Sequence, residues 1–188
     1  MRTEMGLDSV EFIMAVEAAF GIDIPDAEAE RVQTPRDLIG YLTRRLPMSD
    51  AAAPVCLSRR AFYRARRACV VRFGHPRDVL GPGTPLLAVL PEAGRRTHWK
   101  ALRGDLGVEV WPMLLGPVTR HFLGGVETLG QLAGTVATQN AAALRRPDEP
   151  WSPAEVERLV VALIEMELGV DMRRFTLDSS FVHDMGVD

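Results

Sequence analysis

The chain has 188 residues, with 25 acidic and 22 basic side chains, which is enough for one core of ordinary size or two small ones. The near balance of charge excludes the signature of a polyanion-binding protein, so nucleic acid is an unexpected partner. The sequence has two cysteines, which are too few for a disulfide framework, and it shows no metal-ligand spacing. It also shows no secretory signal and no apolar stretch long enough to cross a bilayer. We therefore expect a cytoplasmic protein without disulfides, metal site or membrane span.

Residues 8–20 are predicted to form the first amphipathic helix. Asp8 followed by Glu11 has the form of a capping box, which starts the helix at about Asp8 and puts Ser9 in its first turn. Glu11 and Glu17 are expected on the outside. The predicted buried face consists of apolar residues near helical spacing: Val10, Ile13, Met14, Val16 and Phe20.

Two further helices are predicted before residue 47. Gly21 can end the first helix, and Pro25 prevents its resumption. Asp26 is expected to cap a short helix over residues 27–32. Thr34, followed by proline, is a strong start for the next helix. The apolar side of that helix is expected to consist of Leu38, Ile39, Leu42 and Leu46.

Two linkers are predicted from composition, at residues 47–55 and 144–150, and they bracket a middle segment. After the second linker, Ser152 is a capping serine followed by proline and, at the third helical position, glutamate. Gly169 ends the predicted helix. Its apolar stripe is expected to comprise Val156, Leu159, Val160, Leu163, Ile164 and Leu168.

Residues 4–46 resemble the second, third and fourth helices of an acyl carrier protein, in that family's order. The resemblance rests on GLDSV, the GIDIPD break and the TPRDL helix start. The family's first helix is missing before Glu4, and the segment from Ser152 resembles it, with a tail that ends in MGVD as the family's loop does before its modified serine. This order implies a circularly permuted bundle made of residues 1–48 and 151–188.

The middle segment, residues 56–143, resembles a degenerate second copy in ordinary order, and an unrelated small helical domain is the alternative. Gly74 aligns with Gly169, and Gly107 aligns with Gly21. Without gaps, Leu80, Thr84 and Leu86 then fall opposite Phe175, Ser179 and Phe181. The expected attachment segment, residues 91–96, has no serine. The predicted fold class is therefore all-α, with two acyl-carrier-like four-helix bundles, one permuted and one inserted.

The resemblance implies a carrier rather than an enzyme. It implies that Ser9 receives 4′-phosphopantetheine, and that Asp8 helps to position the transferase's metal-bound phosphates. Glu11, Glu17 and Met14 would form the docking face. The implied partners are a phosphopantetheinyl transferase and acyl-transferring or condensing enzymes of fatty-acid, lipid or secondary-metabolite synthesis. A homodimer that exchanges its first helix is also open, because the connection is long.

The spacing leaves a second interpretation open. Counted back from Phe20, the family's attachment position falls on Gly6, because its helix has about three more residues after the serine. Either the helix is one turn short and Ser9 is the attachment point, or the serine has been lost. In the second case the chain is an unmodified pseudo-carrier that acts as a protein-interaction module.

The basic run from Arg59 to Arg77 also has several interpretations. On a predicted helix it could bind nucleic acid, pack against the acidic helix that contains Ser9, or form a solvated face.

Overall fold

A computed structural model describes residues 7–51, 55–114 and 125–187 and divides the chain into two compact units. Unit 1 comprises Met1–Val55 and Arg146–Asp188, and unit 2 comprises Cys56–Arg145. Every regular element of the described residues is helical, and isolated backbone bridges are the remaining β-type pairing. The predicted all-α fold class is therefore confirmed.

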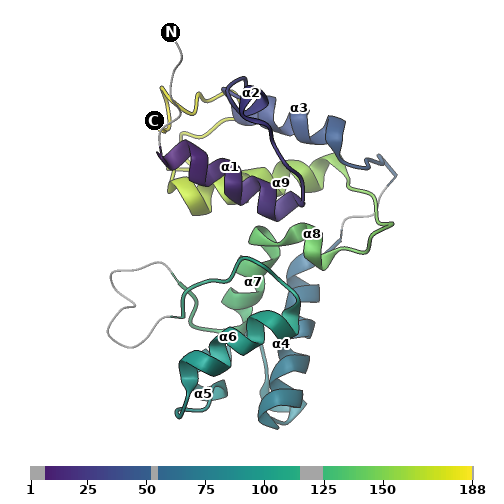
Figure 1. Cartoon of the computed structure of the whole chain (residues 1–188), viewed down its shortest axis with the longest axis vertical. Helices are drawn as coiled ribbons and strands as arrows, with labels where there is room; N and C mark the ends of the chain where they lie inside the picture. The colour runs from purple at the N-terminus through teal and green to yellow at the C-terminus, as the bar shows by residue number, and fades with distance from the viewer. Residues whose placement is uncertain (1–6, 52–54, 115–124, 188) are drawn as a thin grey trace. The chain divides into compact units, whose positions relative to one another are not determined.

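Unit 1 combines the two ends of the chain. Its elements are α1 (Leu7–Phe20), α2 (Asp26–Ala29), α3 (Pro35–Arg45), α9 (Pro153–Leu163) and the π-helical turn η2 (Ile164–Leu168). The C-terminal helix α9 packs against α3 and α1, and η2 packs against α1 (Figure 1). Helix α9 thus packs against helices that precede it in the chain by more than a hundred residues.

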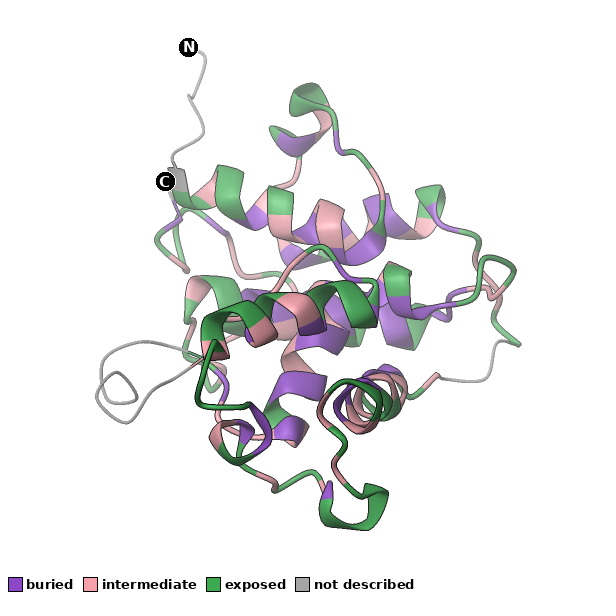
Figure 2. Ribbon diagram, turned by 60° about the horizontal axis from the view of Figure 1, so that its bottom comes forward, coloured by how far each residue is buried: buried purple, intermediate pink, exposed green. Residues whose placement is uncertain are grey.

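The buried faces of α3 and α9 match their predicted apolar stripes. On α3, Leu38, Leu42 and Leu46 are buried, and Tyr41 joins them. On α9 and η2, the fully or almost fully buried side chains are Val156, Leu159, Val160, Leu163 and Ile164. Figure 2 shows the ribbon of the chain coloured by burial. Leu168 and Ile39 are half-buried. Burial of these aliphatic side chains is the main stabilising contribution to unit 1.

The buried face predicted for α1 is wrong in part. Val16 and Phe20 are buried, but Val10 and Met14 are 37% and 60% exposed. Phe12 and Ala19 take their places in the core. The buried face of α1 therefore differs from the predicted one, because the tail loop covers the side of the helix that contains Phe12. The ring centroid of Phe12 lies 5.4 Å from that of Phe181 in this loop.

Two of the predicted helix caps are confirmed, and the one at Asp26 is wrong. At α3, the Thr34 hydroxyl accepts from the Asp37 backbone N–H and the Asp37 carboxylate accepts from the Thr34 N–H, which confirms a capping box. The predicted Ser152 cap of α9 is also confirmed. Asp26 does not cap α2, because extended Pro25 holds the cap position and its carbonyl accepts the first helical bonds. That helix also ends at Ala29, earlier than predicted.

The start of α1 differs by one residue from the prediction. The helix begins at Leu7, so Asp8 already has helical geometry and lies within the first turn instead of at the cap. Its other end is as predicted, since Gly21 follows Phe20 with a φ of 66° and donates its N–H to the Glu17 carbonyl. A positive φ of this size favours glycine over any residue with a Cβ.

Unit 2 is built around its longest helix. Its elements are α4 (Leu57–Phe73), η1 (Arg77–Val79), α5 (Leu86–Val89), α6 (Arg95–Leu106), α7 (Leu129–Gln139) and α8 (Ala141–Leu144). Helix α4 packs against α6, α7 and α8. Leu144, placed in a linker by composition, is buried and closes α8, where its carbonyl accepts a hydrogen bond from Arg60.

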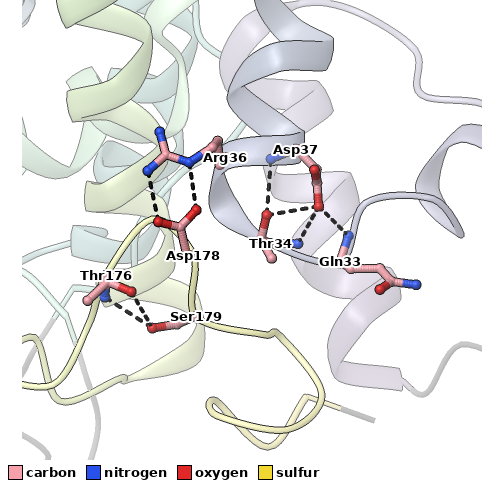
Figure 3. A network of polar contacts seen from close by, with 7 residues as sticks. All are labelled: Gln33, Thr34, Arg36, Asp37, Thr176, Asp178 and Ser179. Carbon is pink, nitrogen blue, oxygen red and sulfur yellow. Dashed lines mark hydrogen bonds and ion pairs between the residues drawn. The ribbon is translucent and has the colours of Figure 1, made fainter.

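A recurrent set of hydrogen bonds connects the loop after η2 with the start of α3 in unit 1, and the loop after α4 with the start of α7 in unit 2. In unit 1 the bonds run from Arg36 N to Leu177 O (2.9 Å), from Phe181 N to Gln33 O (3.0 Å) and from Thr176 N to Ser179 Oγ (3.1 Å). Figure 3 shows the polar contacts in this part of the molecule. The extended tail is thereby fixed to α3.

Unit 2 repeats this set, with its loop residues at the positions that the ungapped alignment assigns and with Thr128 in the place of Thr34. The bonds run from Gly130 N to Pro82 O (2.7 Å), from Leu86 N to Glu127 O (2.7 Å) and from Gly81 N to Thr84 Oγ1 (2.9 Å). Helix α7 also begins with a capping box, between Thr128 and Gln131. The two units therefore share a local architecture as well as an order of apolar residues.

Candidate functional site

The N-terminal turn of α1 holds the predicted attachment residue. Ser9 is the third residue of the helix and is half-exposed, and Asp8 before it is exposed. The first N–H groups of a helix and the positive end of its dipole favour a negatively charged group at this end. Gly6, the alternative attachment position, lies outside the described residues.

The length of α1 determines where Ser9 lies relative to the first residue of the helix. Helix α1 has 14 residues up to Phe20, whereas α6 in unit 2 has 12 and ends before Gly107, whose φ of 66° equals that of Gly21. Counted back from these glycines, α6 begins at Arg95, the position that corresponds to Ser9. Helix α1 begins two residues earlier, so Ser9 lies inside it.

The predicted docking residues fall into two groups. Asp8, Glu11 and Met14 are exposed and follow one another at intervals of three, so they form an outward stripe along α1. Glu17 continues the same spacing but is half-buried, and its Oε1 accepts the Ile24 backbone N–H at 2.6 Å. Its carboxylate therefore shapes the loop before α2, a role that helical spacing alone does not indicate.

One ion pair of unit 1 has no signal in the sequence. The guanidinium of Arg36 on α3 forms two hydrogen bonds, of 2.6 and 2.9 Å, with the carboxylate of Asp178 in the tail loop (Figure 3). The hydrogen bond from Arg36 lowers the pKa of Asp178 below its ordinary value. The two residues are 142 positions apart, so only the folded chain brings them together.

The polar residues of the tail serve its turns. The Ser180 N–H donates to Asp184 Oδ2 at 2.6 Å, and the His183 N–H donates to Ser180 Oγ at 3.2 Å. Their side chains accept backbone protons as in Asx and ST turns. In the described part of the chain, no group of three or more His, Cys, Asp or Glu side chains could hold a metal ion.

No helix within residues 7–51, 55–114 and 125–187 is both long and apolar enough to cross a bilayer.

Comparison with known proteins gives a partial similarity. No family model and no solved structure matches the chain. Over 40 residues the chain is 48% identical to the acyl carrier protein of Thermosynechococcus vestitus, a stretch that covers 21% of this chain and 49% of that protein. It is 51% identical over 39 residues to the acyl carrier proteins of Rickettsia canadensis and Rickettsia massiliae, covering 45% of each. The chain thus spans about half the length of these relatives, and it contains a region similar to acyl carrier proteins.

Proposed function

We propose that unit 1 is a circularly permuted acyl-carrier bundle that carries acyl groups. The observation that supports this most strongly is the packing of α9 and η2 against α1 and α3. A segment that resembles the family's first helix thereby joins the segment that resembles the other three. The similarity to acyl carrier proteins over half their length supports the same proposal.

Ser9 is the proposed attachment point of 4′-phosphopantetheine. Ser9 is a half-exposed residue in the first turn of α1, and the helix N-terminus suits a phosphodiester. When bound, this group supplies a thiol that holds acyl groups as thioesters. The protein's own residues would present the arm and would not catalyse acyl transfer.

The outward stripe of Asp8, Glu11 and Met14 is the proposed docking face for the transferase and for acyl-transferring or condensing enzymes. Two carboxylates and one exposed thioether suit a basic partner surface that also has apolar contacts. Charge on this face would speed association, and the rate would fall as salt is added.

Unit 2 is proposed to be an unmodified copy of the same bundle. The matched hydrogen bonds around α3 and α7 support the common origin. Arg95 occupies the position that corresponds to Ser9, so the copy offers no hydroxyl there.

A second candidate function is an unmodified interaction module. The position of Ser9, two residues inside α1, favours it, because a hydroxyl in a first turn is commonly engaged with nearby backbone groups. In this case the outward stripe would still dock partners, and no thioester would form.

One experiment separates the two candidates. The full chain is incubated with coenzyme A and a promiscuous phosphopantetheinyl transferase, and its intact mass is measured. A carrier gains the mass of one arm, and Ser9→Ala abolishes the gain. Ser58→Ala, at an exposed serine in the first turn of α4, is the matched control and should leave the gain unchanged. No gain in the wild-type chain would contradict the carrier role and favour the interaction module.

A further inference from the structure

Unit 2 has a net positive charge, and the proposed carrier function does not explain it. It contains 13 basic and 5 acidic residues, a net charge of +8, whereas unit 1 contains 9 basic and 20 acidic residues, a net charge of −11. Part of the basic set has a structural role within unit 2. These arginines donate to carbonyls or pair with a carboxylate: Arg60 with Leu144 O, Arg64 with Ala143 O, Arg103 with Val108 O, and Arg72 with Asp105.

A second set of arginines surrounds a hollow on the surface of unit 2. The hollow has a volume of about 390 Å³ and is lined by Tyr63, Arg66, Arg67, Val70 and Arg77. The first four residues follow one face of α4 at spacings of three and four, and Arg77 comes from η1 after the turn at Gly74. Two separate elements therefore contribute arginines to the lining of one hollow.

The guanidinium group of Arg66 lies over two aromatic rings. Its guanidinium carbon lies 4.8 Å from the ring centroid of Tyr63 and 5.2 Å from that of Phe62. Stacking of this kind holds the planar group without using its N–H donors. Among the described residues, no carboxylate lies within ion-pair distance of Arg66, Arg67 or Arg77. Three arginines thus line one hollow, and within residues 7–51, 55–114 and 125–187 none of them forms an ion pair.

We propose that this hollow binds the phosphate group of a small organic phosphate. Guanidinium groups match phosphate oxygens with paired, charge-assisted hydrogen bonds, and a doubly charged anion relieves the mutual repulsion of three arginines. Tyr63 and Val70 supply an apolar surface for the organic part of the ligand. The volume falls at the lower end of the range of small-molecule sites, about 300–1,000 Å³.

A small ligand fits these observations better than a nucleic-acid strand. A strand needs a continuous basic track with successive stacking platforms, whereas here one aromatic ring and three arginines surround a single hollow.

The test uses the full-length protein and isothermal titration calorimetry at low salt. ADP is the main probe, inorganic pyrophosphate tests the phosphate contribution, and adenosine tests the organic part. ADP and pyrophosphate should bind with one site per chain, and adenosine should not bind measurably. The double variant Arg67→Gln/Arg77→Gln should weaken ADP binding by about tenfold or more, as expected when two charge-assisted contacts are lost.

The matched control removes the same charge from α6. Arg96→Gln/Lys100→Gln, at two exposed positions outside the hollow, should change the affinity for ADP by less than about twofold. All four positions are exposed, so both double variants should keep the wild-type melting temperature. The proposal is overturned by the absence of ADP binding at millimolar concentration, or by equal weakening in the two double variants. Binding of a single-stranded oligonucleotide with a steep salt slope, in place of ADP, would also overturn it.

Discussion

Phe12 and Met14 lie two positions apart on α1 and have opposite environments. Phe12 is 3% exposed and packs on Phe181, whereas Met14 is 60% exposed on the outward stripe. Phe12→Ala should lower the free energy of unfolding of unit 1 by about 3–5 kcal/mol, and Met14→Ala should change it by less than about 0.5 kcal/mol. Urea unfolding followed by circular dichroism measures both. Similar losses for the two variants would contradict the assigned face of α1.

The two cysteines of unit 2 should differ in reactivity. Burial, with a smaller contribution from the nearby Asp105 carboxylate, raises the pKa of the Cys69 thiol to about 11, and Cys56 is exposed before α4. Because the thiolate is the reactive form, Cys69 should stay unreactive toward Ellman's reagent in the native protein at pH 8. We expect release of one equivalent of thiol chromophore in native buffer and two in denaturant. A Cys56→Ser variant that still reacts at once would disprove this assignment.

At the scale of elements, α7 contains two glycines with different surroundings. A Cβ at Gly130 would lie 2.8 Å from the carbonyl oxygen of Pro82, the acceptor of the Gly130 N–H, whereas a Cβ at Gly134 would meet nothing within 4 Å. Gly130→Ala should therefore destabilise unit 2 by forcing the loop away from α7. Gly134→Ala should stabilise it by about 0.5–1 kcal/mol through helix propensity.

The same denaturation experiment tests both glycine variants. Because they share a helix, any general effect of added methyl groups appears in both and cancels in the comparison. Equal stabilisation by the two alanines would mean that the contact between Pro82 and α7 does not exist in solution.

The elements that the sequence predicts correctly are those that depend on short local motifs. The caps at Thr34 and Ser152 depend on residues within one turn, so short motifs were sufficient to locate α3 and α9. The buried face of α1 depends on the tail loop, and the role of Glu17 depends on the Ile24 N–H across a turn. Tertiary contacts of this kind override helical spacing, so the predicted face and part of the predicted docking set differ from the structure.

Pairings over long distances in the chain set a similar limit. The pair of Arg36 with Asp178 joins residues that no motif connects, and hydrogen bonds of Trp151 with Pro47 and Ser49 tie a predicted linker into unit 1. The order of family-like motifs nevertheless predicts which ends of the chain should meet. The same order leaves the state of Ser9 open, because it does not fix the first residue of α1.

At the scale of the whole molecule, residues 146–188 complete the bundle that α1 and α3 begin. Hydrogen exchange measured by mass spectrometry tests it most directly, by comparing the full chain with a variant that ends at Arg145. Without α9, the apolar faces of α1 and α3 lose their main partner and short helices are marginal alone. We expect the amides of α1 and α3 to lose their protection from exchange in the shortened chain, while those of α4 and α7 keep it. Undiminished protection of α1 and α3 in the shortened chain would contradict it.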